Sequence, residues 1–277
     1  SSPQESSGPV GAGRRRSYMA CPSARSLPTV LGSATWPVSP TTSPPPAGPS
    51  TPVSARVVVI CASHGERGSD IGPVRNDELG RERAREMRDA AEALGIAEVR
   101  LLSHPDGDLR WAEVTDFNAE IVLFLRRYRT SAVITFGEDG LYWHPDHIGV
   151  YERVLTAVAS LGSEAPPLYY VTMPRGVMPE IVDAARARGW TAPKKGFWSI
   201  TPESFGLLAE PHTMELDVVP FVWQKLAAIV AHRSQMGAGH PFSNLTPSDA
   251  ARWLGREFFR RAEVGGRPDA LLEQLCT

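Results

Sequence analysis

The chain has 277 residues, of which 42% are hydrophobic and 22% charged, and its formal net charge at pH 7 is −2. This length suits one large α/β domain, or one domain with a tail. The nearly neutral charge gives no general attraction to nucleic acid or to anionic membranes. No apolar run approaches the roughly 20 residues that span a bilayer.

The three cysteines, Cys21, Cys61 and Cys276, are widely separated in the sequence. An odd and scattered set argues against a disulfide framework and against a cysteine zinc site. The basic run at 14–16 is followed by no apolar stretch of the kind found in signal peptides. We therefore expect a protein of the reducing cytoplasm.

Residues 1–55 differ in composition from the rest of the chain. They are rich in Pro, Ser, Gly and Thr, lack apolar periodicity and contain almost no acidic residues. Such a segment cannot bury enough apolar surface to offset the conformational entropy that folding removes. The composition predicts a disordered or non-native segment over 1–55, followed by one folded domain over 56–277.

From residue 56 onward, apolar runs alternate with helical patterns. The β-branched run 56–62 is typical of a buried parallel strand. A long helix, capped by Asn76 or Asp77, is expected to end at Gly95. We expect further strands at 99–102, 132–136, 168–173 and 212–217, and further helices at 116–128, 148–161, 179–188, 218–233 and 248–262. This alternation predicts an α/β fold, a Rossmann-like and mostly parallel sheet with helices on both faces.

The long helix carries many charged side chains, and polar loops follow the strands on either side of it. We interpret the charged side of this helix as mostly solvated and salt-bridged. Its members are Arg81, Glu82, Arg83, Arg85, Glu86 and Arg88. The loops 63–70 and 103–109 both begin where a predicted strand ends, and ligands of open α/β sheets bind at that edge.

A third loop, between strand 132–136 and the next helix, holds two imidazoles and a carboxylate within His144-Pro145-Asp146-His147. At the carboxyl edge of a parallel sheet, such a set is a candidate metal and acid/base site. The alternative is a helix cap, in which Asp146 accepts first-turn amides and Pro145 occupies the first turn. Neighbouring glycine and aromatic residues favour chemistry, because a cap needs neither.

Five pieces of sequence, in order between about residue 56 and 236, resemble the LmbE-like or PIG-L zinc-dependent N-deacetylases. They are the strand and loop 57–68, the helix segment 83–95, the loop 102–109 with Pro105-Asp106-Gly107, the motif 144–147, and the segment 225–235 with His232-Arg233-Ser234-Gln235. Each piece alone is a weak signal, whereas their common order and spacing identify the family.

The resemblance implies a hydrolase in which a water bound to Zn²⁺ attacks an acetamide carbonyl. It implies that His147 binds the zinc. It also implies that His144 stabilises the oxyanion or protonates the leaving amine, and that Asp146 orients the catalytic groups.

The resemblance further implies that Glu66, Arg83 and Asp106 contact the substrate. The implied substrate is a small N-acetylated glycoside or a thiol conjugate of one, with no nucleic-acid partner. From the residues alone, Glu66 is equally well a loop cap, Arg83 a helix-face salt bridge and Asp106 a turn former. Nearby aromatic residues such as Tyr142 and Trp143 suit either sugar stacking or a core.

The chain departs from the family at the first motif, Ala-His-Pro-Asp-Asp, which supplies the other zinc ligands. It should follow a strand that precedes 56–62, yet no His occurs before His64. His104-Pro105-Asp106 is similar in letters but occupies the place of the family's Pro-Asp-Gly loop. We therefore expect the first strand and helix to be missing and an apolar flank of the sheet to be exposed, as a shifted reading frame at the gene start would produce.

This departure leaves three functional hypotheses. The first is a zinc-dependent N-deacetylase, or an inactive copy of one. The second is a non-catalytic sugar- or partner-binding relic of the same fold. The third is a different hydrolase that uses His144 and His147 without the first motif.

Overall fold

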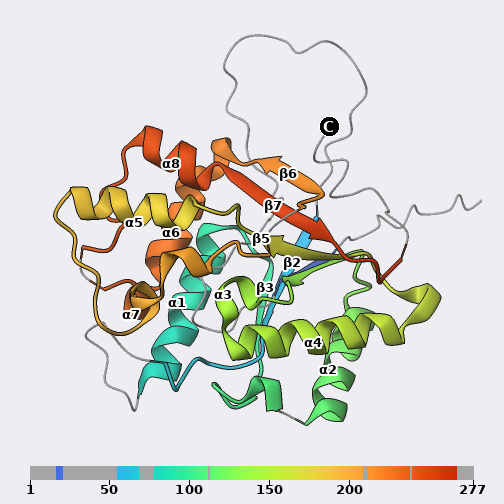
Figure 1. Cartoon of the computed structure of the whole chain (residues 1–277). Coiled ribbons are helices and arrows are strands. Elements are labelled where there is room, and N and C mark those ends of the chain that lie inside the picture. Colours follow the sequence, from blue (N-terminus) through green and yellow to red (C-terminus); the bar gives the residue numbers. More distant parts are fainter. Residues whose placement is uncertain are drawn as a thin grey trace, which may run out of the picture.

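The computed structural model describes residues 17–20, 55–68, 78–111, 113–208, 211–237 and 239–266 (Figure 1). The strands are β1 (Ser17–Ala20), β2 (Arg56–Cys61), β3 (Glu98–Leu101), β4 (Ala132–Phe136), β5 (Leu168–Thr172), β6 (Met214–Asp217) and β7 (Arg256–Arg261). The helices are α1 (Leu79–Ala93), α2 (Val114–Arg127), α3 (Gly140–Trp143), α4 (Pro145–Ser160), α5 (Val177–Ala187), α6 (Val222–Ala231), α7 (Arg233–Met236) and α8 (Pro247–Leu254).

The strands form one sheet in the order β3-β2-β1-β4-β5-β7-β6. The first five strands are parallel, β7 is antiparallel to β5, and β6 is antiparallel to β7. The prediction of a Rossmann-like, mostly parallel sheet is confirmed. The sequence order reverses between β1 and β4, and this is the position at which open α/β sheets bind ligands at their carboxyl ends.

Helices cover both faces of the sheet, as right-handed crossovers require. The connection from β2 to β3 through α1 runs in the opposite direction to the connections through α2 and α4. Consequently α2 and α4 lie together on one face, whereas α1 and α6 pack together on the other (Figure 1). Residues 57–61 of β2 and all of β4 are buried between these layers. No helix in the described part of the chain is long and apolar enough to cross a membrane.

Strand β1 corrects the expectation that the first strand is missing. It lies at the centre of the sheet, where Met19 is in register with Val58 of β2 and Val133 of β4. Without it, the facing edges of β2 and β4 would each leave a row of backbone N–H and C=O groups unpaired. The rest of residues 1–55, with its predicted disorder, and the predicted caps Asn76 and Asp77 lie outside the described residues.

The C-terminal part also differs from the prediction. The expected helix 248–262 ends at Leu254, and the chain continues as strand β7. Gly255 marks the change, because a Cβ there would lie 2.2 Å from the carbonyl oxygen of Ala251. β7 then completes two ladders, with β5 and β6, and this tertiary pairing overrides the local helical pattern.

Candidate active site

The predicted site is built on the turn that connects β4 to α4. Three of the four residues 140–143 in this turn have positive φ: Gly140 (+55°), Leu141 (+74°) and Trp143 (+65°). For residues other than glycine, this conformation costs about 1–2 kcal/mol each. Such strain persists where the surrounding structure holds it, and it is frequent at functional sites.

His144 is the N-cap of α4, and its Nδ1 accepts a hydrogen bond from the backbone N–H of Asp146 at 3.2 Å. Pro145 occupies the first helical position, as the capping interpretation predicts. The cap is therefore the imidazole, and the carboxylate that was expected to serve it is used elsewhere. Because Nδ1 is an acceptor, Nε2 of His144 carries the ring hydrogen.

His147 is the third residue of α4, in its first turn, and is completely buried. Its Nδ1 is 2.9 Å from the carbonyl oxygen of Gly140, and its ring stacks on Phe136 at 4.0 Å and 6°. A carbonyl oxygen only accepts, so Nδ1 donates and the lone pair is on Nε2. The His144 ring is 4.7 Å away, and the Tyr142 ring meets His147 edge-on at 5.1 Å.

Asp146 is also completely buried, and both of its oxygens accept backbone amides from the loop after β3. The N–H of Gly107 donates at 2.7 Å and that of Leu109 at 3.1 Å. The carboxylate thus fastens this loop to the start of α4. The structure assigns Asp146 a positioning function, because neither oxygen is directed to an imidazole.

The loop after β3 is fastened in turn to the loop after β2. Asp106 accepts from the Ser63 hydroxyl at 3.2 Å and from the backbone N–H of Arg67 at 3.0 Å. Glu66 accepts from the backbone N–H of Asp106 at 3.0 Å. Asp106 is buried, whereas Glu66 is exposed. We call Glu66, Asp106 and Asp146 the carboxylate staples, since each ties a loop to a neighbouring loop or helix through backbone amides.

Arg83 is buried in α1, and its Nη1 donates to the carbonyl oxygen of Gly65 at 2.5 Å. A side chain at Gly68 is incompatible with this position, because a Cβ there would lie 2.0 Å from the same Nη1. Arg83 and His144 line one cavity of about 330 Å³. Its other lining residues are Tyr142, Trp143, Pro145, Gly196, Phe197, Ser199, Ile200 and Gln235. We call this space the polar cavity; the residues Glu66, Asp106 and Asp146 do not line it.

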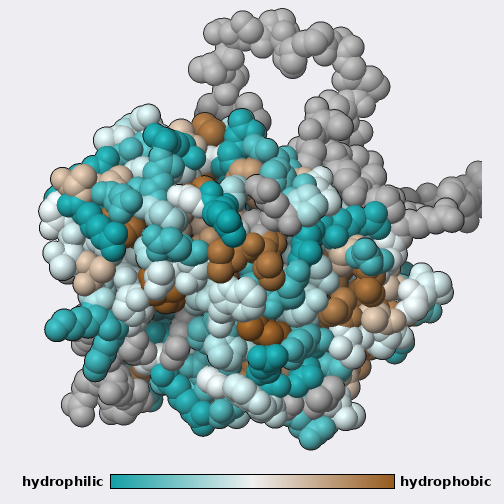
Figure 2. Space-filling view, viewed as in Figure 1, coloured by the Kyte–Doolittle hydropathy of each residue, from teal (hydrophilic) through white to brown (hydrophobic). Residues whose placement is uncertain are grey.

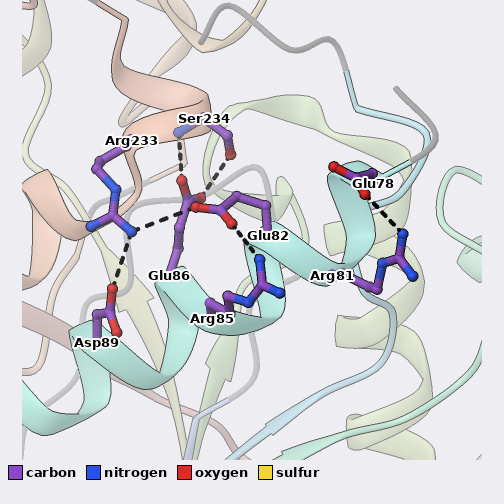
Figure 3. Close-up of polar contacts among 8 residues, drawn as sticks. All are labelled: Glu78, Arg81, Glu82, Arg85, Glu86, Asp89, Arg233 and Ser234. Carbon is purple, nitrogen blue, oxygen red and sulfur yellow. Dashed lines mark hydrogen bonds and ion pairs between the residues drawn. The ribbon is translucent and has the colours of Figure 1, made fainter. Parts of the chain in front are cut away.

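The interpretation of α1 as carrying a mostly solvated charged side is wrong for Arg83 and Glu86, which are both buried. Figure 3 shows the Glu86 carboxylate directed at α7, where it accepts from the Ser234 backbone N–H at 2.6 Å and hydroxyl at 2.7 Å. Burial raises the pKa of Glu86 above its usual value, although these hydrogen bonds oppose the shift.

Three other residues that the prediction named, Arg81, Glu82 and Arg85, do form ion pairs at the surface. Arg81 pairs with Glu78, and Arg85 pairs with Glu82, both at i,i+3 spacing (Figure 3). Arg233 of α7 adds ion pairs with Asp89 at 3.2 Å and with Glu82 at 3.6 Å. Together with Glu86, these contacts hold α7 against α1, and α7 supplies Gln235 to the polar cavity.

His232, at the junction of α6 and α7, gives a pH-dependent stability. Burial, and then the positive charges of Arg83 and Arg233, lower the pKa of its imidazole to about 4, while Asp89 opposes the shift. The unfolded chain binds this proton at the ordinary pKa of 6.5, so between pH 6.5 and 4 it binds more protons than the folded chain does. We expect the free energy of unfolding to fall as the pH drops through this window, with a slope on the order of 1 kcal/mol per pH unit.

Urea unfolding of the wild type and of His232→Gln, measured from pH 7.5 to 4, checks this expectation. The variant removes the titrating group and should lose that part of the slope. Equal slopes in the two proteins would show that other groups govern the acid sensitivity.

The described residues provide one suitable donor for the zinc that the resemblance implies. His147 has the neutral tautomer that metal ligands require, with Nδ1 held by a backbone carbonyl. A catalytic zinc needs three protein ligands, and the described part of the chain contains no group of three or more His, Cys, Asp or Glu side chains placed to bind a metal. His104 lies 2.8 Å from Glu120 and packs on Phe117. Among the described residues, the donor set for a catalytic zinc is therefore incomplete.

Sequence reasoning identified Arg83 and His144, which the fold brings together in the polar cavity. It missed Ser199, Gly196 and Gln235. Gln235 carries a signal, since it ends the His232–Gln235 piece of the resemblance, although the resemblance implies no role for it. Ser199 and Gly196 carried none, because they come from an irregular segment that no pattern places near α4.

Known proteins resemble this chain in sequence and fold. Residues 52–158 match the PIG-L family, described as GlcNAc-PI de-N-acetylase. Two relatives bear the name 1D-myo-inositol 2-acetamido-2-deoxy-alpha-D-glucopyranoside deacetylase. The protein of Acidothermus cellulolyticus is 28% identical over 74% of this chain and 78% of its own length. The protein of Thermobispora bispora is 29% identical over the same shares.

A solved structure supports the fold. The A40926 pseudoaglycone deacetylase superposes with a TM-score of 0.53 over 92% of this chain and all of its own, at 14% identity. The resemblance first seen in five short motifs is thus confirmed: residues 52–158 are similar to the PIG-L de-N-acetylases, and both named relatives are deacetylases.

Proposed function

We propose that the protein hydrolyses the N-acetyl group of a small molecule that contains an amino sugar, such as an N-acetylated glycoside or a thiol conjugate. The observation that carries this proposal is the pair His144 and His147, 4.7 Å apart at the carboxyl edge of the sheet and beside the polar cavity. The names of the relatives support the same class of reaction.

His144 has the chemistry that amide hydrolysis needs from a side chain. With Nδ1 accepting from the Asp146 amide, Nε2 is the ring nitrogen that carries the hydrogen, and the residue lines the polar cavity. A donor in this place stabilises the oxyanion that forms on the acetamide oxygen, and it can pass a proton to the departing amine.

The walls of the polar cavity suit a sugar. Arg83 and Gln235 provide hydrogen-bonding groups for hydroxyls, and Ser199 adds a third polar residue. Trp143 is half exposed at 48% and, with Tyr142, provides an aromatic surface for the apolar face of a sugar ring.

We further propose that His147 is one ligand of a zinc ion. Such an ion, when bound, would supply an activated water. The support is the tautomer of His147 and its place in the His-Pro-Asp-His motif.

The test is acetate release from 1D-myo-inositol 2-acetamido-2-deoxy-alpha-D-glucopyranoside by the purified full chain, with zinc per chain measured by elemental mass spectrometry. We expect His144→Gln to lower the rate about 10²-fold, the loss typical of a missing general acid. His212→Gln, two residues before β6 and outside the polar cavity, is the matched control and should keep the full rate. No acetate at any zinc concentration, or an unaffected His144→Gln variant, would refute the proposal.

A non-catalytic sugar-binding protein is the second candidate. It is favoured by the sequence after β1, which reads Cys21-Pro22-Ser23-Ala24 where the family motif reads His-Pro-Asp-Asp. On this hypothesis, calorimetry detects binding of the N-acetylated ligand, whereas neither acetate release nor bound zinc is detected.

A further inference from the structure

A second cavity, of about 140 Å³, lies between the end of β5 and the helices α5, α6 and α8. Its walls are mostly aliphatic and aromatic, and they include Leu141, Met178, Ile181, Phe205, Ile229 and Phe242. We call it the apolar cavity. Hydrophobic side chains gather near the middle of the face shown in Figure 2, over the region where β5 ends and α3 lies in Figure 1.

The charged residues of this lining are already paired. Lys225 forms a buried ion pair with Glu257 and donates to the carbonyl oxygen of Leu254 at 3.1 Å. At the periphery, Arg252 pairs with Glu180, and Arg256 pairs with Glu215 at 2.7 Å. A ligand therefore has no unpaired charge to neutralise in the apolar cavity, and its favourable contribution there comes from burying apolar surface.

The apolar and polar cavities are separated by little more than one side chain. Phe197 lines both, and the consecutive residues Leu141 and Tyr142 line one cavity each. The Phe197 ring packs edge-on against Tyr142 at 5.9 Å and against Phe205 at 5.8 Å, and the rings of Tyr142 and Phe205 are themselves 5.0 Å apart. It is only partly buried and follows Gly196, whose φ is +80°.

We propose that the apolar cavity is a subsite for an apolar substituent of the amino sugar, reached from the polar cavity past Phe197. This inference rests on the proposed function, because it places the sugar beside His144. A cavity of about 150 Å³ lined by Leu, Ile and Phe is known to hold benzene, so the substituent is an alkyl or aryl group of about six carbon atoms. This substituent is either part of the acyl group on the amide nitrogen or the aglycone of the sugar.

The experiment compares three probes by calorimetry on the full chain. Methyl N-acetyl-β-D-glucosaminide is the reference probe. Hexyl N-acetyl-β-D-glucosaminide carries a six-carbon alkyl chain as its aglycone. Methyl N-hexanoyl-β-D-glucosaminide carries a six-carbon acyl chain on the amide nitrogen. We expect one of the two hexyl-sized probes to bind at least about tenfold more tightly than the reference, since each buried methylene adds favourable transfer energy. The tighter probe identifies the point of attachment.

Two variants that fill the apolar cavity test whether the six-carbon substituent of the probe binds there. Ile181→Phe and Val177→Phe add bulk from α5, at a buried and a partly buried position. With either variant, the hexyl-sized probe should bind only about as tightly as the reference probe. The affinity of the reference probe should stay unchanged, which also shows that the variant is folded. Leu123→Phe, on the exposed side of α2, adds a similar ring elsewhere and should change neither affinity.

Equal binding of all three probes to the wild type would overturn the subsite and leave the proposed function intact. If a hexyl-sized probe still bound more tightly than the reference to both cavity-filling variants, the subsite would also be overturned, because the six-carbon substituent would then bind elsewhere. Failure of every probe to bind would refute the proposed function, and the subsite with it.

Discussion

Replacing Asp146 with Ala should lower the free energy of unfolding by about 4 kcal/mol, because two backbone amides lose their acceptor. The N–H groups of Gly107 and Leu109 both donate to this carboxylate, and Asp146 itself is completely buried. Each buried donor left without a partner costs about 1–3 kcal/mol. The loop after β3 would also be released from α4, so we expect weaker binding of an N-acetylated sugar as well.

Urea unfolding measures this loss. Asp146→Asn keeps the shape and one acceptor oxygen, and should retain about half of the stability that Asp146→Ala removes. Asp183→Ala is the matched control, since Asp183 is 71% exposed and makes only an i,i+3 ion pair with Arg186; its effect should stay within about 0.5 kcal/mol. A loss below about 1 kcal/mol for Asp146→Ala would contradict the positioning function.

Substituting Ala for Gly140 should cost about 3 kcal/mol and displace His147. The added Cβ would lie 2.8 Å from the Cβ of His147 and 3.0 Å from the backbone nitrogen of Ile148. About 1 kcal/mol comes from the positive φ of +55°, and the remainder from forcing packed neighbours apart. The Gly140 carbonyl also holds Nδ1 of His147, so the same change disturbs the imidazole.

Gly162→Ala separates these two contributions. Gly162 has nearly the same φ, +54°, but a Cβ there would meet no atom within 4 Å. Its substitution should therefore cost only about 1 kcal/mol. Thermal unfolding of both variants, together with the NMR signal of the His147 Nδ1 proton, provides the measurement. Equal losses at the two glycines would show that the contact with His147 is unimportant.

The fold could be predicted wherever periodicity is long and local. Strands β2 and β4 are continuous apolar runs, and the helices between them repeat clearly, so the parallel sheet followed from the sequence. β1 could not be found this way, because four residues in a Pro- and Ser-rich segment carry no period. β7 was assigned to a helix because Phe258 and Phe259 fit a helical stripe, and only pairing with β5 and β6 decides between the two.

The candidate site was predictable in its residues more than in its contacts. His144 and His147 are close in sequence, so a local motif brings them together. The partners of Asp146 and Asp106 lie about 40 residues away along the chain, and no spacing rule connects them. Their physical role became visible only when the loops were placed side by side.

The carboxylate staples have a consequence for how this scaffold can diverge. Glu66, Asp106 and Asp146 hold their loops almost entirely through main-chain N–H groups, which every residue except proline possesses. The exposed side chain at position 67 can therefore be exchanged while the path of the backbone is kept, whereas Leu109 is buried in the core. Evolution, or a directed library, is free to change what these loops present to a ligand without dismantling the framework that supports them.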